Sequence, residues 1–78
     1  MINEEKKKEL EAATFKRLVS HLQKNTDLQN IDLMNLAGFC RNCLSKWMVE
    51  EAEKMNITLD YEKVRADIYG MDYSEWKK

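Results

Sequence analysis

The chain has 78 residues, with 13 basic and 14 acidic side chains and a net charge of −1 at pH 7. This length suffices for a single domain over residues 1–78, since domains most often hold about 100 to 150 residues. Hydrophobic residues make up 44% of the chain and charged residues 35%, and proline is absent. Such a composition excludes a disordered tail, a collagen-like chain and a disulfide-rich scaffold.

A chain this small buries only about 60% of the surface that its unfolded form exposes, so its stability is marginal without very good packing. Its two cysteines, Cys40 and Cys43, are too close in sequence to close a useful disulfide loop. A bound metal or a second copy of the chain remains as an added source of stability. Self-association is the simpler expectation, because it needs no special residues.

The first predicted element is a helix over residues 3–24. Its apolar residues recur at helical spacing among lysines and glutamates, and they are Ala12, Phe15, Leu18, Val19 and Leu22. Asn25 stands where this helix would end. The T-x-x-Q run from Thr26 to Gln29 then has the form of a capping box, which starts a new helix.

A long central helix is predicted next, from Asp32 as a possible N-cap to about Met55. A wide apolar stripe indicates it, with its main residues at Leu33, Leu36, Cys40, Leu44, Trp47 and Met48. Gly38 lies on another side of the predicted helix, where it could bend the helix or admit another backbone. Met34 and Phe39 stray from the stripe. We expect an interface with a partner subunit or partner protein to involve Met34, Phe39, Trp47 and Met48.

A third helix is predicted to begin after Asp60 and to run through Tyr69, with Gly70 just past its end. The run from Asp72 to Glu75 resembles a second capping box, whose short turn would hold Trp76 against the body of the molecule. No strand is evident. The predicted fold is all-α, with about three principal helices and short capped turns, packed as a homo-oligomer.

The C-x-x-C motif Cys40-Arg41-Asn42-Cys43 has three interpretations. In the first, both cysteines are core residues on the apolar stripe. In the second, they bind zinc or another divalent metal together with His21, and the remaining ligands come from a carboxylate, from water or from the cysteines of a second chain. The third is thiol redox chemistry, which normally needs the first cysteine at a helix N-terminus and usually a preceding strand, whereas the pattern places Cys40 inside a helix with no strand before it.

Other functional classes have less support. Neither a nucleophile–base grouping nor a glycine-rich phosphate loop is recognisable, and the charge balance lacks the excess of basic residues typical of nucleic-acid binding. No run approaches 18 apolar residues, and MINEEKKKE is not a secretory signal, so we expect a cytoplasmic protein without a membrane span. The favoured function is a non-enzymatic helical interaction module, a homodimer, and the alternative is a metal-binding or thiol-dependent protein.

The stretch HLQKNTDLQNIDLMNLAGFCRNCLSKW, residues 21–47, closely resembles a family of short bacterial proteins catalogued as a domain of unknown function. Its signature is the run NIDLMNLAGFCRNCL, from Asn30 to Leu44. The resemblance implies an all-helical fold that assembles as an oligomer, and it implies no activity. Polar residues threaded through this apolar run, among them Asn30, Arg41 and Asn42, must be satisfied by some partner.

Overall fold

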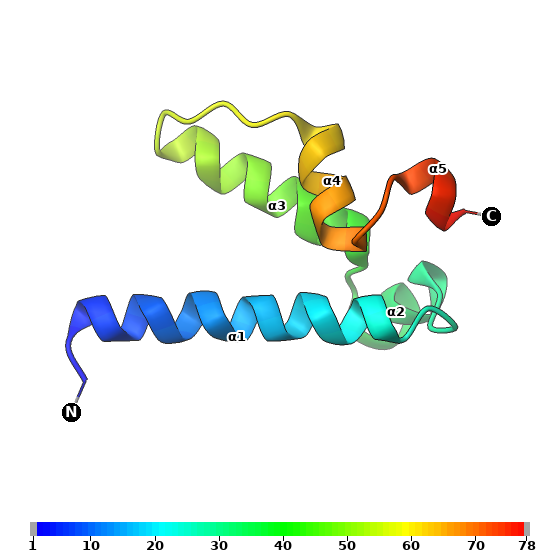
Figure 1. Cartoon of the computed structure of the whole chain (residues 1–78), viewed down its shortest axis with the longest axis horizontal. Coiled ribbons are helices and arrows are strands. Elements are labelled where there is room, and N and C mark those ends of the chain that lie inside the picture. Colours follow the sequence, from blue (N-terminus) through cyan, green and yellow to red (C-terminus); the bar gives the residue numbers. More distant parts are fainter. Residues whose placement is uncertain (1, 78) are drawn as a thin grey trace.

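The computed structural model describes residues 2–77, and within this range it contains helices and no strand (Figure 1). The helices are α1 (Glu4–Lys24), α2 (Asn30–Ala37), α3 (Arg41–Lys54), α4 (Tyr61–Tyr69) and α5 (Tyr73–Trp76). α1 runs along one side of the molecule, α3 and α4 lie on the other, and α2 and α5 lie near the C-terminal end of α1. The prediction of an all-α fold is therefore confirmed.

The first helix agrees with its prediction at both ends. The side chain of Asn3 caps the N-terminus by accepting a hydrogen bond of 2.8 Å from the backbone N–H of Lys6. At the other end, the side-chain amide of Asn25 donates to the carbonyl of His21, also at 2.8 Å. Glu4 and Glu5 in the first turn add a favourable charge next to the helix N-terminus.

The prediction of one long helix over residues 32–55 is wrong, because Gly38 divides it into α2 and α3. Gly38 has a φ of +77°, a left-handed backbone conformation that ends α2 and that residues other than glycine rarely adopt. Cys40 is then extended, with φ −143° and ψ −178°, and serves as the N-cap of α3. Nothing lies within 4 Å of the place where a Cβ of Gly38 would be, so the glycine is needed for its backbone conformation alone.

The N-terminus of the second helix, α2, also differs from its prediction. The capping box that begins α2 is formed by Gln29 and Asp32, whose carboxylate accepts from the backbone N–H of Gln29 at 3.0 Å. Thr26 therefore lies in the preceding turn, and Asp32 lies inside the first turn of α2 as the partner of the cap.

The C-terminal third follows its prediction more closely. Asp60 caps α4 through the backbone N–H of Glu62 at 3.1 Å, and Gly70 ends it with a φ of +78°. A short helix, α5, does follow Asp72, whose side chain makes no capping bond of its own. No helix within residues 2–77 is long and apolar enough to cross a membrane.

A small core joins the helices. Its buried members come from α1, α2, α3 and α4 and from the N-cap of α3, and they are Leu22, Leu33, Cys40, Leu44, Val64 and Ile68. The side-chain amide of Gln23 fastens α1 to the end of α4 by donating to the carbonyls of Asp67 and Ile68. Because the break at Gly38 turns α3 relative to α2, the expected stripe is not buried as a whole. Leu36 is 85% exposed, and Trp47 and Met48 are also exposed.

Candidate functional site

The signature run folds around a single buried arginine. Arg41, in the first turn of α3, is 1% exposed. Its guanidinium donates to the backbone carbonyls of Leu22, Asn25 and Leu28 at 3.0, 3.1 and 2.8 Å, and to the side-chain carbonyl of Asn30 at 3.1 Å. All four acceptors are neutral oxygens, and they lie between the last turn of α1 and the first residue of α2. Arg41 thus fixes the path of the chain between these two helices.

Burial of this cation has an electrostatic cost. Desolvation lowers the pKa of Arg41 below its ordinary value, although Tyr69 and Cys40 act in the opposite direction. The ring of Trp76 lies over the guanidinium at 5.1 Å, which adds a cation–π contact. The Trp76 ring therefore compensates part of the electrostatic cost of burying Arg41.

Tyr69 links the two halves of the signature run to α4. Its phenol accepts from the side-chain amide of Asn30 at 2.9 Å and donates to the side-chain oxygen of Asn42 at 2.7 Å. Tyr69 is 1% exposed, and burial raises the pKa of its phenol. Trp76 packs edge-on against the Tyr69 ring with centroids 4.9 Å apart, so the expected contact of Trp76 with the body of the molecule is confirmed.

The thiols of Cys40 and Cys43 lie at the N-terminal end of α3. Their sulfur atoms are 3.8 Å apart, and neither is in a disulfide. Cys40 belongs to the buried core, whereas Cys43 is half-buried and packs against that core. The objection that Cys40 lies inside a regular helix therefore does not hold, because its backbone is extended.

His21, the third predicted metal ligand, is exposed on the last turn of α1. Across residues 2–77 the structure gathers no group of three or more histidine, cysteine, aspartate or glutamate side chains that could hold a metal ion. A single chain therefore supplies the two thiols without the further ligands that a closed tetrahedral zinc site requires.

Two adjoining apolar hollows share Phe15 and Met48 and lie between α1 and α3, and one of them reaches α4. We call them together the α1–α3 groove, and their apolar lining residues are Phe15, Val19, Leu44, Trp47, Met48 and, from α4, Ile68. Two of the four predicted interface residues, Trp47 and Met48, therefore lie in it. Phe39 is half-buried and packs against both the core and the Trp47 ring, with centroids 5.9 Å apart. Met34 is exposed on α2 and is not among the lining residues.

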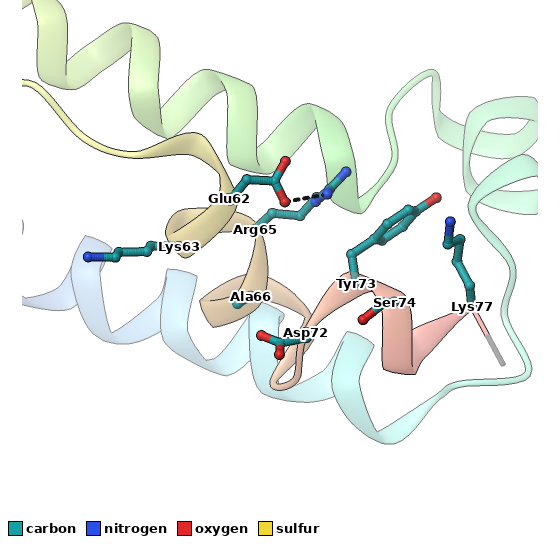
Figure 2. Close-up of a pocket in the computed structure, with 8 residues that line it drawn as sticks. All are labelled: Glu62, Lys63, Arg65, Ala66, Asp72, Tyr73, Ser74 and Lys77. Atoms are coloured by element: carbon teal, nitrogen blue, oxygen red, sulfur yellow. Dashed lines mark hydrogen bonds and ion pairs between the residues drawn. The ribbon is translucent and has the colours of Figure 1, made fainter.

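Figure 2 shows a second hollow, between α4 and α5, which is lined mainly by charged side chains. Arg65 lies between Glu62, at 2.6 Å, and the ring of Tyr73, at 4.0 Å, while Lys63 extends away from them. The lining of this hollow includes Ser74 but neither a histidine nor a cysteine. The arginine is already engaged by an acid and an aromatic ring, and the hollow offers no recognisable catalytic grouping.

Burial of Arg41 also bears on nucleic-acid binding. A basic face would have required Arg41 to lie beside Lys16, Arg17, Lys24 and Lys46, and instead its guanidinium points inward to backbone carbonyls. Such a face is therefore incomplete in this fold.

The fold and these features define a small all-α protein organised by a buried arginine and a pair of thiols. The family described as "Protein of unknown function (DUF1244)" matches residues 28–78, well over half of the chain, and the chain belongs to that family. The expected membership in a family of unknown function is thereby confirmed. No curated protein matches this sequence.

Asn30, Arg41 and Asn42 were predicted to need polar partners, and Tyr69 was predicted as the end of a helix. The sequence did not reveal that Tyr69 is the partner of both asparagines. The residues joined by these bonds are 39 and 27 positions apart, and no local spacing signals a contact over such a separation.

Proposed function

We propose that this protein is a non-enzymatic helical interaction module that acts as a homodimer, with the α1–α3 groove of each copy covered by the other. The observation that carries this proposal is the large exposed surface of the single chain. Its accessible area is 6231 Å². A compact monomer of 9.3 kDa exposes about 5,000 Å².

The excess of about 1,200 Å² is larger than the roughly 800 Å² that each partner contributes to a standard interface. Its source is visible in the shape of the chain, which measures 43 × 29 × 21 Å. Residues 4–14 of α1 are exposed along their whole length, and an isolated helix of that length is marginal in water. Packing against a second copy would cover this segment and stabilise it.

The groove has the composition of an interface centre. Trp47 is 49% exposed and Met48 is 37% exposed, and both residue types are enriched in protein interfaces. Tryptophan is also among the residues that most often dominate binding energy. The polar rim includes Lys16, Glu51 and Asp67, which fits a centre of apolar side chains surrounded by solvated ones.

The test is the mass in solution, measured by sedimentation equilibrium on the parent, Trp47→Glu and Leu36→Glu. We expect a dimeric parent and a monomeric Trp47→Glu variant, because a buried carboxylate would lack a partner. Leu36 is exposed on α2, outside the groove, so Leu36→Glu is the matched control and should stay dimeric. A monomeric parent at high micromolar concentration would refute the proposal, and so would a dimeric Trp47→Glu variant.

Metal binding by Cys40, Cys43 and His21 is a second candidate function. The sulfur separation of 3.8 Å supports it, since it suits two thiolates on one tetrahedral zinc with Zn–S bonds of about 2.3 Å. Of the two further ligands, His21 could supply one after moving, and the other would come from a carboxylate, from water or from another chain. Native mass spectrometry tests this, because a bound ion adds mass that is lost on denaturation and absent in Cys43→Ser.

A further inference from the structure

We propose that Cys40 and Cys43 are a redox-active dithiol that is converted reversibly to an intrachain disulfide by thiol–disulfide exchange. The inference does not depend on dimerisation, because it uses only the start of α3. Its central observation is that the two free sulfur atoms are 3.8 Å apart in the folded chain. A disulfide bond is about 2.05 Å long, so closure requires an approach of somewhat less than 2 Å.

The backbone at Cys40 makes this closure accessible. Two cysteines three residues apart inside a regular helix would form a strained disulfide, since both backbones are held by the helix. Cys40 is instead the extended N-cap, and Cys43 lies in the first turn of α3. Redox C-x-x-C motifs have this arrangement, with the first cysteine where a helix begins.

The pair lies at the N-terminus of α3. The N-terminus of a helix carries partial positive charge, and the first turn of α3 contains no acidic residue. The adjacent guanidinium of Arg41 is buried and interacts electrostatically with Cys40. Its hydrogen bonds to the carbonyls of Leu28 and Leu22 hold it in place.

Different exposure assigns different roles to the two thiols. Cys43 is half-buried and can be reached from solvent, whereas Cys40 is 8% exposed and lies in the core. The thiolate of Cys43 attacks a sulfur of an incoming disulfide, and one thiolate leaves as a mixed disulfide forms. The thiolate of Cys40 then attacks the sulfur of Cys43, and the second thiolate leaves. Two protein thiols and one disulfide thus yield one protein disulfide and two small thiols, and the reverse steps restore the dithiol.

The exchange partner is a disulfide, either a small molecule or the dithiol–disulfide pair of another protein. Burial of Cys40 favours exchange over a metal site shared between chains, because a ligand in the core cannot reach a second subunit. The parent, Cys40→Ala and Cys43→Ala distinguish thiol–disulfide exchange from metal binding in the experiment below.

The experiment exposes the reduced full-length chain to glutathione disulfide, quenches with acid, and measures intact mass after alkylation of the remaining thiols. We expect the parent to lose two hydrogens and both free thiols together, with no glutathione retained and an unchanged circular dichroism spectrum. Cys40→Ala should retain one glutathione on Cys43, because no second thiol resolves it. Cys43→Ala should react more slowly by a factor on the order of 100 or more, since Cys40 becomes accessible only by local opening.

Three results would overturn the inference. One is retention of glutathione on the parent, and another is a parent that reacts only in denaturant concentrations that unfold it. The third is a metal ion on the purified parent that disappears in Cys43→Ala, which would make the thiols ligands. If Cys40→Ala does not fold, the parent and Cys43→Ala still decide, because the parent reports closure and Cys43→Ala reports the burial of Cys40.

Discussion

Replacing Arg41 with methionine would remove the contacts that hold the end of α1 to the start of α2. Methionine keeps much of the aliphatic stem and removes every donor. Loss of the buried hydrogen bond to the carbonyl of Leu22 would cost about 1.5 to 3 kcal/mol of stability, as expected for a bond from a charged donor. The other three acceptors are partly exposed and can bind water, so loss of each of these bonds would cost about 0.5 to 1 kcal/mol.

The gross loss of about 3 to 6 kcal/mol is reduced by one opposing effect. Burial lowers the pKa of Arg41, which means that the fold opposes the charge, and removing the charge removes this penalty. We therefore expect Arg41→Met to lower the free energy of unfolding by about 2 to 4 kcal/mol. A chain of 78 residues is stable by about 4 to 12 kcal/mol, so the variant should lose a large part of its stability.

Urea unfolding followed by circular dichroism measures this loss, at one fixed protein concentration because the proposed dimerisation would contribute to apparent stability. Thermal unfolding should show a midpoint lower by about 10 to 30 °C. Arg17→Met is the matched control, since Arg17 is exposed on α1 and should matter by less than about 0.5 kcal/mol. Arg41→Lys keeps the charge without the planar fork and should fall between the two. An Arg41→Met variant as stable as Arg17→Met would refute the reasoning.

Two further predictions concern the turn at Gly38 and the phenol of Tyr69. Gly38→Ala should cost about 1 to 2 kcal/mol in the same urea experiment, because alanine would have to adopt the left-handed backbone conformation although its Cβ has room. Gly38→Asn should cost less, and a Gly38→Ala variant as stable as the parent would show that the turn relaxes freely. Tyr69→Phe should cost about 1 to 2 kcal/mol, since it leaves Asn30 and Asn42 without their shared partner. Burial raises the pKa of the Tyr69 phenol, so its contribution to stability is complete below the unfolded value of about 10 and is lost as pH rises through the folded value. The stability of Tyr69→Phe should therefore decline less above pH 10 than that of the parent, and equal declines would contradict the assignment.

The elements that the sequence predicted correctly are those with local signals at their ends. Asn25 ends α1, and Asp60 and Gly70 bound α4, as their residue types indicate. The break between α2 and α3 was not predicted, because apolar residues keep helical spacing across Gly38 and a single glycine is compatible with a continuous helix. Its conformation depends on contacts from elsewhere, such as those that Arg41 makes to the end of α1.

This break determines what the signature run can do. With a continuous helix, Cys40 would be one more residue of the apolar stripe, and a disulfide to Cys43 would be strained. With Gly38 left-handed, Cys40 becomes an N-cap and its sulfur lies 3.8 Å from that of Cys43. Arg41, Asn30 and Tyr69 are already satisfied by one another or by backbone carbonyls, so the polar residues of the run are explained by folding alone. The proposed functions rest instead on the two thiols and on the exposed apolar residues Trp47 and Met48 of the α1–α3 groove.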